Sequence, residues 1–504
     1  MPIMNEPGRK NKKINRRLCL FAALIALSMA FACSCGNKEP GDGNDDIAGN
    51  IGQEGANEGD ANEGQESQVQ DNLPERNFDG YDFVMYMRDD EHYNADMYAE
   101  SEIGEAINDA VYKRNKKTEE RFNINIVPMY YDKDEWDAAS AQKTILAGED
   151  SFDIVAAHGA GAFIMAQKNY AVDWFENMPH VNFDAPWWAA DTIKNLSAFG
   201  KLYCITGDIS HKGLASTGCI LFNKDLFESL GIKYPYDEVL NGKWTVEKFM
   251  SIAKSGASDL NGDGAMTIGE DRYGVEIRHE WDYPISMLYC GGDRVISIGD
   301  DGAPQLAIYN ERTVDIVDKL IDMLGDEAVY MHDLAKDGNF PLNTAFRSGR
   351  SLFYTTYLQD VVNHRDLEYE IGILPLPKYE QSTPKYCTNV DAGQNVLSVP
   401  VTAADTERTS VIAEALCAEG SRLVMPAFYD VSLKTKYSRD DESSAMIDYV
   451  KEGRVYDYGY FNSSVSLDLA YVGQRLATTK NFNFTSFYEK LEAKVQKNID
   501  DLNK

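Results

Sequence analysis

The sequence predicts an α/β fold, in which strands and helices alternate along the chain and form layers around a largely parallel sheet. Two observations lead to this prediction. Short apolar runs alternate with segments whose apolar residues recur at helical spacing, first over residues 81–157 and again over 219–376. The chain also has 504 residues, which is enough for two or three hydrophobic cores. After about residue 431 the pattern becomes mainly helical.

Five elements open the folded part in the order strand, helix, strand, helix, strand. Their expected ranges are Tyr81–Met87, Glu102–Phe122, Ile124–Met129, Trp136–Ala147 and Phe152–Ala157. In the first helix Ile107, Val111 and Phe122 lie at helical spacing, and Gly148 ends the second helix.

The N-terminus predicts export. Basic residues precede an apolar run, Leu18–Ala32, which is shorter than the ~20 residues of a membrane-spanning helix. The small residues that lead into Cys33 resemble the lipobox of bacterial lipoproteins, which implies a signal peptide over residues 1–33 and lipidation of Cys33. Cys35 is the alternative lipidated residue, and a plain secretory signal is the alternative to a lipoprotein.

An acidic tether is expected over residues 34–77. From Glu39 to Glu75 there is no Lys, Arg or aromatic residue, so this stretch cannot bury enough area to fold. Its like charges repel one another and extend it.

The charge balance of the whole chain excludes nucleic acid as a partner. The 49 Lys and Arg residues stand against 81 Asp and Glu, a formal net charge of −32 that repels phosphate backbones. The 43% hydrophobic content suits a globular protein and is too low for one with many membrane spans.

The cysteines beyond the N-terminal segment show no disulfide framework and no CxxC pair, so buried free thiols are expected. They are Cys204, Cys219, Cys290, Cys387 and Cys417. Cys204 and Cys219 could pair only if they lay on neighbouring strands.

Several strings resemble the extracellular solute-binding proteins of bacterial sugar importers, the family that contains maltose-binding protein. They are SFDIVAAHG (151–159), DAPWW (184–188), GKLYCITGD (200–208), FNKDLFESLGI (222–232), GKWTVEKFMSIAK (242–254), SLFYTTYLQD (351–360) and IGILPLP (371–377). Their order and spacing match the family over about residues 80–430.

This resemblance implies a two-lobed, type II periplasmic-binding-protein-like fold, with a mixed sheet flanked by helices in each lobe and a hinge between the lobes. It implies a first lobe over residues 78–215 with a return segment at 384–430. The second lobe would cover 216–383, together with C-terminal helices at 431–504.

The segment Asp259–Glu270 (DLNGDGAMTIGE) fits the pattern of a calcium-binding loop at every specified position. Calcium prefers six or seven oxygen ligands. The expected ligands are Asp259, Asn261, Asp263, the carbonyl of Ala265, Thr267 directly or through water, and Glu270. A helix precedes the loop and a strand follows it, so a single structural calcium ion is expected and a paired sensor is not; an empty turn is the alternative.

Sugar sites need aromatic platforms together with groups that donate and accept hydrogen bonds. Six residues at loops or strand ends fit this description: His158, Trp187, Trp188, Asp208, Trp281 and Tyr357. Tyr357 lies where the resemblance implies a stacking aromatic. Core packing is the alternative for the tryptophans, and helix capping is the alternative for His158.

These observations predict a binding protein and not an enzyme. It would be a monomer, lipid-anchored on the outer face of the bacterial membrane, that captures a carbohydrate, expected to be an oligosaccharide, and delivers it to the permease subunits of an ABC transporter. No nucleotide-binding, serine-hydrolase or zinc-protease motif is present. A peptide or other polar ligand is one alternative. A secreted glycoside hydrolase or lyase is the other, because a catalytic acid pair is defined in space and not by sequence.

Overall fold

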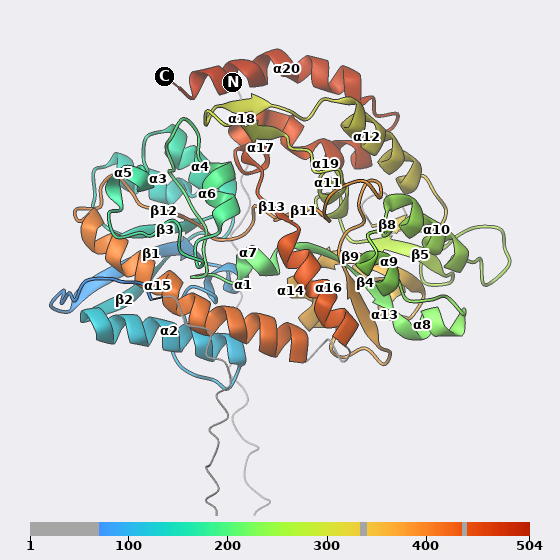
Figure 1. Cartoon of the computed structure of the whole chain (residues 1–504), viewed down its shortest axis with the longest axis horizontal. Coiled ribbons are helices and arrows are strands. Elements are labelled where there is room, and N and C mark those ends of the chain that lie inside the picture. Colours follow the sequence, from blue (N-terminus) through green and yellow to red (C-terminus); the bar gives the residue numbers. More distant parts are fainter. Residues whose placement is uncertain (1–69, 333–339, 436–440, 504) are drawn as a thin grey trace, which may run out of the picture. The chain divides into compact units, whose positions relative to one another are not determined.

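The computed structural model describes residues 70–332, 340–435 and 441–503 (Figure 1). The expected signal peptide, both candidate lipidation cysteines and most of the expected tether lie outside these residues. Within the described ranges, no helix combines the length and apolar character that crossing a bilayer requires.

The first lobe is built on a four-stranded mixed sheet with the order β12-β3-β1-β2. Its strands are β1 (Tyr81–Arg88), β2 (Ile124–Tyr131), β3 (Ile154–Ala157) and β12 (Val396–Ser398). Strand β1 pairs in parallel with β2 and β3, and β12 is antiparallel to β3. Phe83, Met85 and Met87 alternate along β1 and are fully buried, as expected for a strand with one face on the core.

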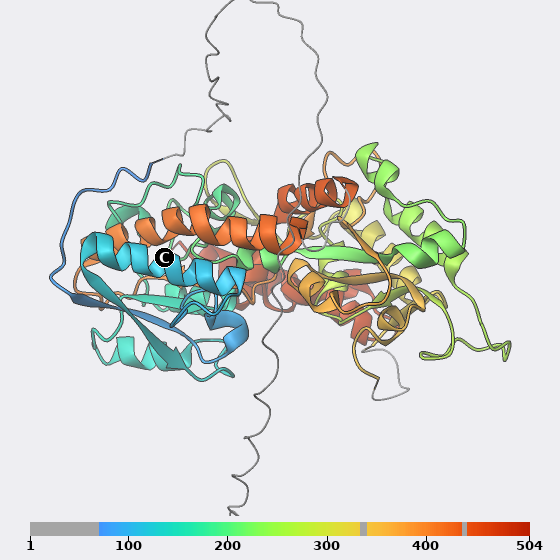
Figure 2. The same ribbon diagram turned by 90° about the horizontal axis from the view of Figure 1, so that it is seen from below.

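The helices of the first lobe include two long ones, α2 and α15, which pack against each other side by side (Figures 1 and 2). The helices are α1 (Glu91–Asn94), α2 (Ala106–Phe122), α3 (Ala139–Leu146), α4 (Gly159–Gln167), α5 (Trp174–Asn177), α6 (Ala190–Leu196) and α15 (Thr406–Pro426). Helix α2 begins four residues later than predicted, because Gly104 has a φ of +83° and the backbone N–H groups of Ile103 and Gly104 donate to Asp109.

The second lobe is built on a five-stranded mixed sheet with the order β10-β4-β9-β5-β8. Its strands are β4 (Gly218–Asn223), β5 (Tyr273–Ile277), β8 (Val329–Met331), β9 (Ser351–Tyr357) and β10 (Ile371–Leu374). Strand β5 pairs in parallel with β8 and β9, while β4 is antiparallel to β9 and β10. Every residue of β4, β5 and β9 is buried, as expected for strands of a sheet that is covered on both faces.

The other elements of the second lobe are mostly short helices around this sheet and one small hairpin. They are α8 (Lys224–Ser229), α9 (Tyr236–Leu240), α10 (Val246–Gly256), α11 (Tyr283–Met287), α12 (Glu311–Leu324), α13 (Thr344–Arg347), α14 (Leu358–Val361), η1 (Val362–His364) and the hairpin β6 (Ile296–Ile298) with β7 (Pro304–Leu306). Thr245 caps α10 by accepting a hydrogen bond from the Lys248 N–H.

The lobes are joined where the chain crosses between the sheets. The segment that leaves the first lobe contains α7 (Lys212–Ala215), and the segment that returns contains β11 (Thr388–Asn389). These two segments pair in antiparallel fashion at Thr217 and Val390, and β11 pairs in parallel with β13 (Arg454–Val455). The two-lobed α/β architecture with mixed sheets and crossing segments agrees with the predicted fold class.

The C-terminal elements pack on both lobes, whereas the prediction grouped residues 431–504 with the second lobe. They are η2 (Ala427–Thr435), α16 (Asp441–Glu452), α17 (Tyr458–Phe461), α18 (Ser463–Ser466), η3 (Leu467–Tyr471), α19 (Val472–Thr478) and α20 (Phe484–Asp501). Helices α17 and α18 contact α4 of the first lobe, while α19 contacts α11 and α12 of the second. Figure 1 shows α20 above α18, and α20 also contacts β7 and α12.

Two details of the fold bear on sequence predictions. Residues 70–77, which the prediction placed in the tether, contact the first lobe: Arg121 pairs with Asp71 at 2.6 Å and Leu73 packs against the core. Contacts with the first lobe therefore begin before residue 78, where the prediction placed the start of that lobe. The five described cysteines are all buried and free, so the expectation of unpaired thiols is confirmed and Cys204 does not pair with Cys219.

Candidate ligand-binding site

The carboxyl ends of the parallel strands bring the candidate residues together. In the first sheet β1 ends at Arg88, and β3 is followed by His158. In the second sheet β9 ends at Tyr357, and β5 is followed by Arg278. Ligands of α/β folds bind outside the carboxyl ends of the strands, so these four residues lie where a ligand is expected.

Asp391, on the returning segment, connects the two lobes at this point. The hydroxyl groups of Tyr357 and Tyr460 donate to Oδ2 of Asp391 at 3.1 and 3.2 Å. The Asp391 backbone N–H donates to the carbonyl of Ser216, and the carbonyl of Ala392 accepts from the Gly159 N–H. We call His158, Tyr357, Asp391 and Tyr460 the interlobe cluster.

His158 caps helix α4 and also lies in the interlobe cluster. Its Nδ1 accepts a hydrogen bond from the Ala160 N–H at 3.1 Å. Burial lowers the pKa of His158 to about 4; nearby Asp391 raises it and Arg88 lowers it further. The ring is therefore neutral at pH 7, with its hydrogen on Nε2, which makes Nε2 a donor.

Tyr357 is held between Asp391 and an arginine. The guanidinium of Arg278 lies over the Tyr357 ring, 5.0 Å from its centroid. Arg278 also forms ion pairs with Asp282 and Asp360. Burial, followed by the charge of Asp391, raises the pKa of Tyr357, so its hydroxyl stays a hydrogen-bond donor at neutral pH.

Charged groups beside the cluster also come from both lobes. Lys212, on the crossing helix α7, donates to Oε1 of Gln359 in the second lobe at 3.3 Å. Burial lowers the pKa of Lys212, while the charges of Asp96 and Asp360 raise it. Burial also lowers the pKa of His92 in the first lobe, which the charge of Asp360 raises. The facing surfaces of the lobes are therefore polar and close.

Each lobe also has one exposed tryptophan in a loop that follows the carboxyl end of a strand, Trp136 after β2 and Trp281 after β5. Trp281 of the second lobe is 43% exposed and stacks on His279 with ring centroids 4.1 Å apart. Trp136 of the first lobe is 51% exposed, and its ring lies edge-on to that of His158. Exposed indole faces of this kind can stack on the apolar face of a sugar ring.

The structure corrects the prediction for Trp187 and Trp188. Both rings are buried in the core of the first lobe. Their indole N–H groups donate to the two carboxylate oxygens of Glu414 on α15, at 3.0 and 2.6 Å. Burial raises the pKa of Glu414 to about 7, although these hydrogen bonds lower it. The two tryptophans are core residues, since no face of either ring is left for a ligand.

Asp208 is also separate from the interlobe cluster. Its backbone N–H donates to the carbonyl of Trp187, and its side chain bonds Ser421 on α15. Its own carbonyl lies so close to Gly420 that a side chain at that position would collide with it. Burial raises the pKa of Asp208 to about 6. Asp208 therefore belongs to the packing between the crossing segment and α15.

The loop Asp259–Glu270 lies at the end of α10 and leads into β5, as the sequence predicts. Both carboxylate oxygens of Asp259 accept backbone N–H groups, from Gly262 at 2.6 Å and Gly264 at 2.8 Å. The Asn261 amide donates to Asp263 and Glu270 at 3.2 and 3.0 Å, so these side chains converge. Among the described residues, however, no three Asp, Glu, His or Cys side chains are gathered closely enough to hold a metal ion.

Sequence reasoning missed three residues at the site. Asp391 carries a local signal, an Asp-Ala-Gly turn in which its Oδ1 accepts the Gly393 N–H. Tyr460 lies in the tyrosine-rich stretch Tyr456–Phe461, where packing is the usual role of such residues; it does pack in the core, but its hydroxyl also reaches Asp391. Trp136 was expected to begin a helix, yet α3 begins at Ala139 and leaves Trp136 in a loop.

No family model and no curated protein matches the chain at the sequence level. Its fold, however, is similar to those of solved binding proteins. A sugar transporter of Rhizobium etli in an open conformation has a TM-score of 0.58 and 13% identity, covering 83% of this chain and 99% of that one.

Two further solved structures contain ligands. UgpB of Mycobacterium tuberculosis, in complex with glycerophosphocholine, has a TM-score of 0.54 and 14% identity, covering 84% of this chain and 99% of that one. An ABC substrate-binding protein of Listeria monocytogenes, in complex with cycloalternan, has a TM-score of 0.50 and 14% identity, covering 84% of this chain and 98% of that one. The chain therefore has the two-lobed fold of these binding proteins.

Tyr357 is buried and Trp281 is exposed, so replacing them with alanine should lower the free energy of unfolding by different amounts. Tyr357 is 3% exposed, so Tyr357→Ala should lower the free energy of unfolding by about 3 to 5 kcal/mol. Tyr357→Phe removes only the hydroxyl and should cost about 1 kcal/mol. Trp281→Ala should cost about 1 kcal/mol or less. Urea unfolding measures all three, and equal losses for the two alanine variants would contradict this placement.

Proposed function

We propose that the chain is the substrate-binding protein of an ABC importer, which captures a carbohydrate outside the membrane and delivers it to the permease subunits. One observation carries the proposal. In a fold shared with sugar-binding proteins, the interlobe cluster and two exposed tryptophans lie where the carboxyl ends of the two sheets meet. The ligand class proposed is an oligosaccharide.

The chemistry of the cluster supports this ligand class. Sugars combine apolar ring faces with many hydroxyl groups. Trp136 and Trp281 offer exposed rings, His158 offers a neutral donor, and Asp391 offers a carboxylate. Because these groups come from both lobes and the returning segment, a ligand bound among them favours closure by contacting both lobes at once.

We further propose that the chain is a binding protein and not an enzyme. Two of the similar solved structures support this, a substrate-binding protein in complex with cycloalternan and UgpB in complex with glycerophosphocholine. The proposal is tested against two alternative functions. One is a glycan-cleaving enzyme, and the other is a binding protein for a peptide or another polar solute.

Binding should separate from stability at the exposed tryptophans. Trp281→Ala and Trp136→Ala are each expected to weaken binding of maltotriose, or of whichever oligosaccharide in a glycan array binds most tightly, by about 1 to 3 kcal/mol. Calorimetric titration measures the loss. Tyr309→Ala is the matched control, because Tyr309 is 38% exposed but is not part of the site.

Two results would argue against the proposal. Release of reducing ends from the bound glycan, abolished by changing one carboxylate, would indicate an enzyme. Binding of peptides with no binding of any glycan would indicate the other class. Small-angle scattering tests closure separately: the radius of gyration should decrease when the ligand saturates the protein.

We also propose that the chain is held at the outer face of the membrane by lipid on Cys33, acts as a monomer and makes no other membrane contact. The predicted signal and the acidic segment after it support this arrangement. Changing both Cys33 and Cys35 to Ser should release the protein from the membrane fraction into the medium. A double variant that stays with membranes and still carries an acyl chain would contradict the lipid anchor.

A structural calcium ion is a further part of the proposal. The loop provides the required oxygen ligands in the order that calcium loops use. Binding would draw the carboxylates of Asp259, Asp263 and Glu270 inward from their present positions, with Asn261, the Ala265 carbonyl and Thr267 completing the ligands. Its role would be to stiffen the connection between α10 and β5.

Calcium should therefore stabilise the protein. At a hundredfold excess over its dissociation constant, the gain is about 2.7 kcal/mol, seen as a higher melting temperature than in chelator. Asp263→Ala should abolish the gain. Asp322→Ala, which removes an exposed carboxylate from α12 of the same lobe, should retain it. If calcium added to metal-free protein leaves the melting temperature unchanged, the result would contradict the calcium site.

A further inference from the structure

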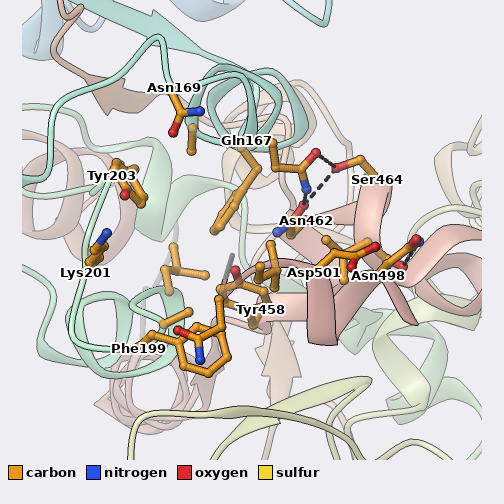
Figure 3. Close-up of a pocket in the computed structure, with 17 residues that line it drawn as sticks. Gln167, Asn169, Phe199, Lys201, Tyr203, Tyr458, Asn462, Ser464, Asn498 and Asp501 are labelled. Atoms are coloured by element: carbon orange, nitrogen blue, oxygen red, sulfur yellow. Dashed lines mark hydrogen bonds between the residues drawn. The ribbon is translucent and has the colours of Figure 1, made fainter. Parts of the chain in front are cut away.

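A cavity of about 530 Å³ lies between the first lobe and the C-terminal helices (Figure 3). None of the four residues of the interlobe cluster lines it. Gln167, at the end of α4, and the turn at Phe199 form one wall, while Tyr458, Asn462 and α20 form the other. His158 caps the opposite end of α4, so the helix separates this cavity from the interlobe cluster.

Asn462 presents a hydrogen-bonding group to the cavity. The residue is fully buried, and its Oδ1 accepts bonds from Gln167 Nε2 at 2.8 Å and Ser464 Oγ at 2.9 Å. Its Nδ2 lies beside the Tyr458 hydroxyl, which can accept one of its two hydrogens, and has no other hydrogen-bond partner within the part of the chain that the structure describes. Figure 3 shows the nitrogen turned toward the cavity.

An amide nitrogen carries two hydrogens, so one buried donor of Asn462 still lacks a partner, which is unfavourable and indicates room for a bound acceptor. The bonds with Gln167 and Ser464 fix one end of the amide. Flipping the amide would turn its oxygen into the cavity in place of the nitrogen, so in either orientation a polar atom of Asn462 faces it. A bound molecule with hydroxyl groups can both donate and accept and would satisfy the amide either way.

The rest of the lining fits a neutral molecule. Among the residues that the structure describes, the charged ones in the lining are Lys201 and Asp501, and Asp501 pairs with Lys497 at 2.6 Å. The other polar groups are amides and hydroxyls, as on Asn169 and Tyr203. Phe199 adds an aromatic ring from a two-residue turn, in which it has a φ of +52°, unusual for a bulky side chain.

We propose that this cavity is a second binding site, for a neutral saccharide or cyclic polyol. Amides and hydroxyls match the hydroxyl groups of such a molecule, the aromatic rings match its apolar face, and the volume lies in the range of small-molecule sites. The walls come from the first lobe and from the C-terminal helices that also contact the second lobe. The proposal does not depend on what the interlobe cluster binds.

The test is calorimetric titration of the full mature chain with D-glucose, maltose, maltotriose and myo-inositol at millimolar concentrations. At least one probe should show a binding component that Asn462→Leu weakens tenfold or more and that Trp281→Ala leaves unchanged. Gln167→Ala is the second variant: Gln167 is exposed, so the fold should survive its loss, and the Asn462 amide loses the bond that orients it. Binding should again weaken.

Three outcomes would overturn the proposal. One is the absence of saturable heat with any of the four probes. Another is a single binding component that Trp281→Ala removes and both cavity variants leave intact, which would place all binding at the interlobe cluster. The third is binding of acetate or glycine at this cavity as tight as that of the sugars, which would exclude a neutral ligand class. If Trp281→Ala changes no binding component while the two cavity variants weaken one, the result contradicts the proposed function and leaves the second site in place.

Discussion

The antiparallel pairing of β12 with β3 is the constraint on which the rest of the structure depends. The two strands are neighbours in the first sheet, but the entire second lobe lies between them in the sequence. The chain must therefore leave the first sheet, build the second and return. The departing and returning segments pair at Thr217 and Val390, and the next residue, Asp391, is held where both lobes reach it. The site is a consequence of this topology.

The elements that could be predicted are those determined by local patterns. Strands β1 and β3 have apolar runs bounded by turn residues, and α10 has a Thr cap and regular apolar spacing. Strand β12 could not be found in this way, because three residues carry too little pattern and its pairing is not local. For the same reason, the sequence could not show that the C-terminal helices pack on both lobes.

The site was predictable where position along a strand was enough. His158 and Tyr357 follow or end buried strands, and the structure places both in the interlobe cluster. Trp187 and Trp188 looked like loop aromatics because the partner that holds them, Glu414, lies on a helix far along the chain. No local feature distinguishes an indole that meets a ligand from one that meets a buried carboxylate.

That buried carboxylate has a consequence for how the protein responds to acid. The pKa of Glu414 is raised to about 7 and that of Asp208 to about 6 by burial, both well above the values of exposed carboxyl groups. A group whose pKa is higher in the folded than in the unfolded state stabilises the fold below its unfolded value and loses this contribution as pH rises through the folded one. The contribution of these two groups to the packing of α15 against the first lobe is therefore complete below about pH 4 and is lost as the pH rises through about 6 to 7.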